Sequence, residues 1–243
     1  MTRRRTSIRV VIPHSPGDDA HRAAARAWVT DRYRTVHRLP VIEAPAPPGD
    51  WCKAAAVNPA VDELPDTVKV AVIADADSYV TPEALDQAIA DAKTHGWAMP
   101  HRWVHRIAAA DTARILAGDT IRHPALQHPP ASAIAGGGIV VVTADAWRTV
   151  AGFDPGFVGW GYEDSALGLA LDTLVHRWRW PVSKSGPRGK IPALWHLWHP
   201  PQPDRTAPRD QSVRLFAAYQ AAHGDPDAME ALAAPRRTTP GYA

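Results

Sequence analysis

The chain has 243 residues, 45% of them hydrophobic, which is enough for one substantial domain with a buried core. No apolar run approaches the roughly 20 residues that span a bilayer, and the run at residues 8–12 is too short for the core of a signal peptide, so we expect a soluble, cytoplasmic protein. A net charge of +2 does not indicate a nucleic-acid-binding protein, and the single cysteine, Cys52, excludes an intrachain disulfide framework and a cysteine-based zinc site.

Short apolar runs alternate with helical patterns through the first half of the chain. Strands are predicted at residues 8–12, 39–42 and 68–74, and helices at residues 18–33, 51–61 and from residue 81 onward. Asp18 or Asp19 is expected to cap the first helix, and Thr81, followed by Pro82, the third. The third strand is almost wholly apolar and is expected to be buried on both faces. The alternation predicts an α/β domain whose central sheet is mostly parallel and flanked by helices.

The second half of the chain has less regular patterns. Helices are predicted at residues 107–117, 144–150, 163–176 and 209–223, strands at residues 136–143 and 191–196, and loops at residues 120–135 and 183–190. No internal repeat or linker divides the chain, so we expect one domain at residues 8–225 between a basic tail, residues 1–7, and a flexible tail, residues 226–243. Arginines in the two tails are expected to be solvated, with contact to a nucleic acid or another phosphate as the alternative.

Two carboxylates follow the third predicted strand. Asp75 and Asp77 stand one residue apart, directly after the buried apolar run. In open α/β sheets, ligands bind in the crevice outside the carboxyl ends of the strands. Hard divalent ions such as Mg²⁺ or Mn²⁺ take oxygen ligands and often bridge a carboxylate to substrate phosphates. An Asp-rich turn is the alternative, but the position after a long apolar strand favours a metal that neutralises a leaving diphosphate.

The segment at residues 152–164 carries the most information about function. Gly159 and Gly161 free the backbone on either side of Trp160, whose flat ring suits the apolar face of a sugar. Glu163 and Asp164 then begin a predicted helix, where they could simply cap it and where the helix dipole is expected to hold their pKa values low. The functional alternative is that one of the two acids takes a proton from an acceptor hydroxyl as a general base.

Three motifs together resemble the GT-A glycosyltransferases. Asp75-Ala-Asp77, the three glycines at residues 136–138 and the segment Phe-Val-Gly-Trp-Gly-Tyr-Glu-Asp at residues 157–164 occur in the order and rough spacing of that group. The last segment resembles the Trp-Gly-Gly-Glu-Asp motif of β-1,4-galactosyltransferases and chondroitin polymerases. The resemblance covers roughly residues 8–200. It differs at Tyr162, where the motif has its second glycine, so we expect the acceptor side to have a different shape.

The resemblance implies a GT-A fold and roles for particular residues. Asp164 would be the catalytic base of an inverting transfer, and Glu163 would help to bind the acceptor or donor sugar. The residues implied to border the sugars are Gly137, Gly138, Trp160 and Gly161.

Two histidines lie at the end of the last predicted strand. His196 and His199 stand three residues apart, a spacing that is by itself a weak metal signal and is often structural. Enzymes of the resembled type often complete the metal site with a histidine from this part of the chain. This implies His196 as the ligand, with His199 as the alternative ligand or as a partner of the diphosphate or of another ligand. A site made of Asp and His suits Mn²⁺ somewhat better than Mg²⁺.

The remaining candidates concern the nucleotide donor. Residues 51–58 resemble the Lys-Ala-x-x-x-Asn stretch near the nucleotide in family-2-like transferases, which implies that Lys53 pairs with the diphosphate and that Asn58 lies near the donor. A solvated surface lysine is the alternative. Pro13, His14 and Glu43 end the first two predicted strands, where such proteins hold the base and ribose.

The expected function is a metal-dependent hexosyltransferase that moves a sugar from a nucleoside diphosphate, UDP being favoured by the resemblance, to a carbohydrate or other hydroxyl. A sugar nucleotidyltransferase or a metal-dependent phosphohydrolase is an alternative enzyme. Against the nucleotidyltransferase, residues 13–19 hold one glycine, whereas such enzymes open with a glycine-rich phosphate loop. The other alternative is a non-catalytic module that binds a nucleotide or a carbohydrate on the same fold.

Overall fold

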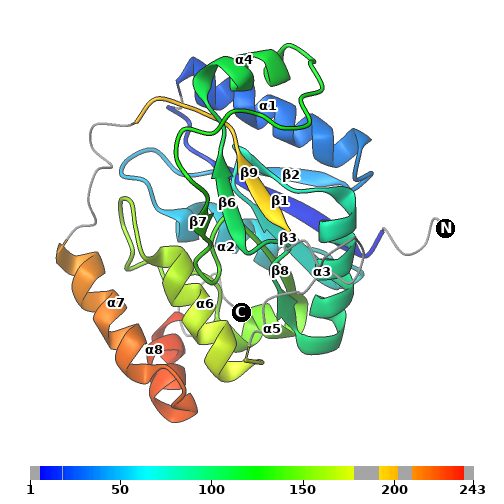
Figure 1. Ribbon diagram of the computed structural model, residues 1–243. Coiled ribbons are helices and arrows are strands. Elements are labelled where there is room, and N and C mark those ends of the chain that lie inside the picture. Colours follow the sequence, from blue (N-terminus) through cyan, green and yellow to red (C-terminus); the bar gives the residue numbers. More distant parts are fainter. Residues whose placement is uncertain (1–5, 18, 178–191, 202–209, 238–243) are drawn as a thin grey trace.

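The computed structural model describes residues 6–17, 19–177, 192–201 and 210–237 (Figure 1). Its central sheet has the strand order β2-β1-β3-β8-β5. The strands are β1 (Ile8–His14), β2 (Val41–Pro45), β3 (Val70–Ala74), β5 (Trp97–Ala98) and β8 (Ile139–Thr143). β1 pairs in parallel with β2 and β3, whereas β8 is antiparallel to both β3 and β5. Only β8 therefore runs against the others, and the expected mostly parallel sheet is confirmed.

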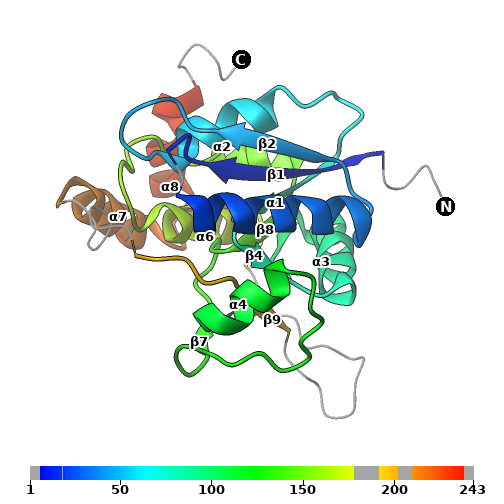
Figure 2. The ribbon, with the colours of Figure 1, turned by 90° about the horizontal axis from the view of Figure 1, so that it is seen from above.

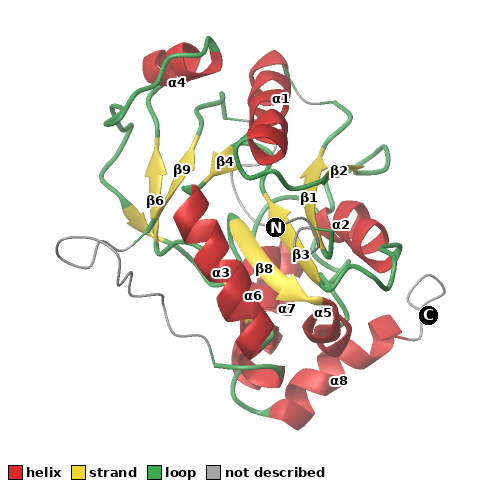
Figure 3. Ribbon diagram, turned by 90° about the vertical axis from the view of Figure 1, so that its right-hand side faces the viewer, coloured by secondary structure: helices red, strands yellow, loops and turns green. Residues whose placement is uncertain are grey.

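Helices cover both faces of this sheet. One face packs against α1 (Ala20–Thr35) and α3 (Pro82–His95), and the other against α2 (Lys53–Asp62), α5 (Ala144–Val150) and α6 (Glu163–Leu174) (Figures 2 and 3). The alternation of side chains along the strands explains the two cores: Val70 and Val72 face the first group of helices, Ala71 and Ile73 the second. Every residue of β3 is buried, as its apolar sequence predicts.

Two helix starts predicted from capping residues in the sequence are confirmed. The Asp19 carboxylate accepts hydrogen bonds from the backbone N–H groups of His21 and Arg22, at 2.8 and 3.0 Å, and so caps α1. Thr81 caps α3, with Pro82 as the first helical residue. Asp18, the loop at residues 183–190 and Ile191 at the start of the last predicted strand lie outside the described residues.

A second, smaller sheet was not expected. It has the order β4-β9-β6-β7, with β4 (Ser78–Tyr79), β6 (Trp103–Arg106), β7 (Ala131–Ser132) and β9 (Ala193–His196); the short α4 (Ala109–Leu116) follows β6. Of these strands only β9 was predicted, within residues 191–196; β4 and β7, of two residues each, are too short to show a period in the sequence. This sheet matters for the site because Ser78 pairs with His196, which brings the end of β9 beside Asp77.

The C-terminal part corrects one expectation. Residues 226–243 were predicted as a flexible tail, but Pro226–Arg237 form helix α8, which packs with α7 (Asp210–Ala222) against α6. Met229 of α8 belongs to the second core and Ala233 is also buried, so the helix is held by its apolar face. Their spacing of four residues, after a proline at the helix start, was the available signal. Within the described residues, no helix combines the length and the apolar character required to cross a bilayer.

Candidate active site

Two polar clusters lie at the carboxyl end of β3, and each contains one of the two aspartates that follow this strand. Asp77 meets the two histidines of β9 and the segment after it, whereas Asp75 turns toward Lys53 at the start of α2. The sequence had suggested both aspartates as metal ligands. Among the described residues, the group suited to a metal contains only Asp77, His196 and His199.

The first cluster brings one carboxylate and two imidazoles together. The Nε2 atom of His199 lies 3.2 Å from Oδ2 of Asp77, and Nε2 of His196 lies 3.6 Å from Oδ1. The ligand atoms of the three side chains all lie within 4.8 Å of one another. Ser78, which sequence reasoning missed although it adjoins Asp77, donates its hydroxyl to Oδ1 of that residue at 3.1 Å. A single cation can therefore reach all three side chains.

The electrostatics of this cluster suit a cation. Burial works to raise the pKa of Asp77, but the neighbouring imidazoles of His196 and His199 outweigh it and hold the pKa well below its ordinary value. Burial lowers the pKa of His199, and the hydrogen bond to Asp77 reverses this to give a raised value. Asp77 is thus ionised, as metal ligation requires, and loss of the imidazole protons is what metal binding would demand. A donor set of one oxygen and two nitrogens fits Mn²⁺ and similar ions.

The second cluster is built around a buried lysine. The Lys53 side chain is only 5% exposed, and its Nζ lies 2.8 Å from Oδ1 of Asp75 and 2.7 Å from Oδ1 of Asp164. Burial lowers the pKa of Lys53, but the carboxylates of Asp164 and Asp75 outweigh it and raise the pKa above its ordinary value. The alternative of a solvated surface lysine is therefore wrong. As Lys53 lies in the structure, its charge is matched by these two carboxylates.

Asp164 corrects the expectation of a low pKa at the start of α6. Burial raises the pKa of its carboxyl group, Lys53 lowers it, and the nearby charges of Glu163 and Asp75 raise it again, so that the pKa reaches about 7. Burial thus outweighs the helix dipole. A carboxylate with a pKa near neutrality can both hold and release a proton at physiological pH, which is the property of a general base.

The loop before α6 presents Trp160 to solvent. The Trp160 side chain is 50% exposed, one of the few large apolar side chains on the surface of the described residues. The backbone on its two sides is fixed: the Gly159 N–H donates to the carbonyl of Trp51 at 2.7 Å, and the Gly161 N–H donates to Oε2 of Glu163 at 3.1 Å. Glu163 thus stabilises the turn that precedes it. Trp160 is exposed enough to stack on a sugar.

The three glycines before β8 serve packing in this structure. A Cβ atom at Gly136 would meet the backbone carbonyl of Asp164, so this glycine permits the close approach of the loop to α6. Gly137 is buried, and a Cβ atom there would meet the Ile134 side chain; that Gly137 borders a sugar stays a prediction. Gly138 is half-buried and accepts a hydrogen bond from the Asp75 N–H at 2.9 Å, so it fixes the turn that separates the two aspartates.

The residues predicted to lie near the nucleotide donor have different surroundings in the structure. His14 is half-buried at the end of β1, next to the buried Pro13. Glu43 lies 3.6 Å from both Arg26 and Arg34 of α1, so its carboxylate already has cationic partners. Asn58 is buried, and its amide both donates to and accepts from the backbone of Phe153, at 2.9 and 3.0 Å. Asn58 thus anchors the loop before α6, and its place near the donor stays a prediction.

One hollow on the surface lies away from the two polar clusters of the candidate site. The hollow formed by Lys69, Trp147 and Arg148, among others, lies at the amino end of β3. It is therefore at the opposite end of the strand from Asp75 and Asp77. The candidate site rests on the side-chain clusters, because ligands of open α/β sheets bind at the carboxyl ends.

Comparison with known proteins gives one family match. Residues 123–172 match the family described as the N-terminal domain of galactosyltransferase. The matched segment contains β8, α5, the Trp160 loop and most of α6, and it covers about a fifth of the chain. A comparison with curated proteins gives no match.

Solved structures of similar shape are glycosyltransferases. The catalytic domain of Drosophila β-1,4-galactosyltransferase 7 in complex with xylobiose is 12% identical, with 86% of this chain and 79% of that chain covered and a TM-score of 0.47. A mutant of the same enzyme with manganese, UDP-Gal and xylobiose is 14% identical, with the same coverage and TM-score. S. aureus TarS with UDP-GlcNAc is 11% identical, with 95% and 72% covered and a TM-score of 0.49. Over residues 123–172 the chain is thus similar to the galactosyltransferase family.

Proposed function

We propose that this protein is a metal-dependent glycosyltransferase that moves a sugar from a nucleoside diphosphate onto an acceptor hydroxyl. One observation carries the proposal: Asp75 and Asp77, two aspartates of a single turn, each supply a carboxylate to one of two clusters, one suited to a cation and one holding a potential base. The match of the Asp164 segment to the galactosyltransferase family supports it.

Asp77, His196 and His199 would hold the metal. All three are partly buried, and their possible ligand atoms lie within 4.8 Å of one another. A divalent cation held there would neutralise the negative charge of the diphosphate. Mn²⁺ is the first ion to test because the donor set mixes nitrogen with oxygen. UDP is the first nucleotide to test, on the resemblance of the sequence motifs.

Asp164 would act on the acceptor. In an inverting transfer, the acceptor oxygen forms a bond to the anomeric carbon while the bond from that carbon to the diphosphate oxygen breaks. The hydroxyl proton passes to the Asp164 carboxylate, and the electron pair of the broken bond leaves with the diphosphate. A pKa of about 7 makes this carboxyl group a competent proton acceptor near neutral pH. The Lys53 contact uses Oδ1 of Asp164.

Lys53 would position the two carboxylates for this reaction. Its ammonium group holds Asp75 and Asp164 in fixed relative positions, at hydrogen-bond distance from both. This differs from the role expected from the sequence, in which Lys53 pairs with the diphosphate. Trp160, half exposed on the loop before α6, is the proposed contact for the apolar face of the acceptor or donor sugar.

The products of the reaction test this proposal. The protein is incubated with a panel of nucleotide sugars and simple glycosides, with Mn²⁺ or with EDTA, and the released nucleotide is identified by chromatography. Release of a nucleoside diphosphate that needs both Mn²⁺ and an acceptor supports the glycosyltransferase. In a parallel incubation with nucleoside triphosphates and sugar 1-phosphates, release of pyrophosphate would instead identify a nucleotidyltransferase. Binding of the nucleotide with no product from any pair would support a binding module.

A further inference from the structure

Tyr162, the residue that departs from the resembled motif, has an unfavourable backbone conformation. Its φ and ψ angles are 72° and −15°, in the left-handed region that L-residues other than glycine rarely adopt. It precedes α6 directly, and its carbonyl accepts a hydrogen bond from the Ala166 N–H at 2.8 Å, so this conformation starts the helix that carries Asp164. The Tyr162 side chain makes no capping hydrogen bond. The left-handed conformation of Tyr162 must therefore be stabilised by contacts with residues outside this turn.

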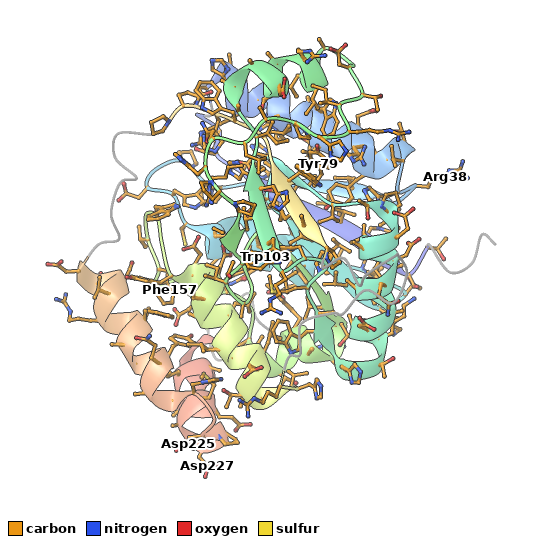
Figure 4. All side chains as sticks on the ribbon, viewed as in Figure 1. Arg38, Tyr79, Trp103, Phe157, Asp225 and Asp227 are labelled. Carbon is orange, nitrogen blue, oxygen red and sulfur yellow. The ribbon has the colours of Figure 1, made fainter. Side chains whose placement is uncertain are left out.

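The ring of Tyr162 is held by α7. It stacks on Phe216 with a distance of 4.5 Å between ring centroids and an angle of 6° between the ring planes. Neighbouring contacts reach the same loop: Tyr219 donates its hydroxyl to Oδ2 of Asp154 at 2.8 Å and packs near Phe157, which Figure 4 shows beside α7. Helix α7 therefore contacts the loop along its length, with the parallel stack nearest to Asp164.

The start of α6 also packs closely against the glycine loop that precedes β8. The loop at Gly136 approaches the Asp164 carbonyl so closely that no Cβ atom would fit. Gly168, one turn further along α6, faces the Ala135 carbonyl with similarly little space. The backbone of Asp164 thus lies between the glycine loop and the segment that α7 holds. A change in the Tyr162 conformation would move the carboxylate directly.

We propose that the stack of Tyr162 on Phe216 is a positioning device, through which α7 fixes the turn that directs Asp164 and Trp160. This inference rests on the proposed function for its catalytic consequence. Glycine adopts the left-handed conformation without strain, so a glycine at this position would hold the turn without a partner. Tyrosine at the same position makes the turn depend on a helix more than fifty residues further along the chain.

A double-mutant cycle tests the device. The wild type, Tyr162→Gly, Phe216→Ala and the double variant are compared by amide hydrogen exchange at residues 159–166 and by kcat for transfer. In the wild-type background, Phe216→Ala is expected to speed exchange and to lower kcat about fivefold, the effect of losing one aromatic pair. In the Tyr162→Gly background, the same substitution is expected to change both quantities less than twofold, on the same reasoning. Met229→Ala, in the buried face of α8, controls for a general loss of stability.

Each outcome decides the matter. Equal effects of Phe216→Ala in both backgrounds would show that the two rings are not coupled, and a change in exchange from Met229→Ala of the same size and location would show a general loss of stability; either result would overturn the inference. Rescue by Tyr162→Gly supports it, because a merely structural loss at Phe216 is not repaired by removing its partner. Hydrogen exchange needs no substrate. If the wild type transfers no sugar, the proposed function fails while the exchange data still decide the role of the stack.

Discussion

The ammonium group of Lys53 lies 2.7 Å from Oδ1 of Asp164, although 111 residues separate them in the chain. The same group lies 2.8 Å from Oδ1 of Asp75. One buried cation thus joins the start of α2, the end of β3 and the start of α6. Breaking a buried ion pair by removing one partner leaves an uncompensated charge, which is why this contact should matter for stability as well as for activity.

Removal of the lysine charge is therefore expected to destabilise the fold. Lys53→Met leaves Asp75 and Asp164 without their common counterion and should lower the free energy of unfolding by about 3–5 kcal/mol. Lys53→Arg keeps the charge and should lose less. Urea unfolding at pH 7 measures both. Lys93→Met, an exposed lysine on α3, is the matched control and should change little. A Lys53→Met protein as stable as the control would contradict this account.

Asp164→Asn tests the proposed base. The amide keeps the size of the side chain but cannot take a proton, so kcat for transfer should fall by about 10²–10⁴. Binding of nucleotide with Mn²⁺ should persist, because Asp164 is not part of the metal cluster among the described residues. Full transfer activity in this variant would remove Asp164 from the mechanism.

The pH dependence of the reaction follows from the same residue. Burial raises the pKa of Asp164 to about 7, and only the ionised carboxylate can accept a proton. The value of kcat/KM should therefore rise as the pH increases toward about 7 and level off above it. Mn²⁺ is kept saturating at each pH, because protons also compete for the imidazoles of the metal cluster. A profile that is already flat between pH 5 and 7 would contradict the raised pKa.

Trp160→Ala should separate sugar binding from folding. The side chain is half exposed, so the free energy of unfolding should change by about 0.5 kcal/mol or less. If the ring stacks on a sugar, KM for that sugar should rise while nucleotide binding is unchanged. Trp51, on the backbone that anchors the loop, is left intact. An unchanged KM for both donor sugar and acceptor would show that Trp160 has no contact with either.

Local patterns predicted the elements that frame the site. The apolar run of β3, the Thr81-Pro82 start of α3 and the residues of α5 were all readable, because each depends on neighbours in the sequence. The place of Asp75 and Asp77 in a candidate site was predicted from the rule that ligands of open α/β sheets bind at the carboxyl ends of the strands.

What the sequence could not supply depends on contacts between distant residues. The strand at residues 191–196 was predicted and the resemblance implied His196 as a metal ligand, but the local pattern did not predict the pairing of this strand with Ser78 in a second sheet. The lysine of α2 looked like a surface residue or a phosphate ligand, because its two carboxylate partners lie 22 and 111 residues away. The pKa of Asp164 was predicted in the wrong direction for the same reason: burial is a property of the whole fold.

Metal-dependent binding of a nucleotide is the most direct test of the central claim. The melting temperature is measured with UDP and other nucleoside diphosphates, in Mn²⁺ and in EDTA, since a ligand of the folded state raises it. The account predicts a shift for one nucleotide that needs Mn²⁺, is lost in Asp77→Ala and His199→Ala, and survives in His223→Ala, whose histidine pairs with Asp172 outside the metal cluster. A shift that is indifferent to EDTA and to Asp77→Ala, or no shift with any nucleotide, would contradict it.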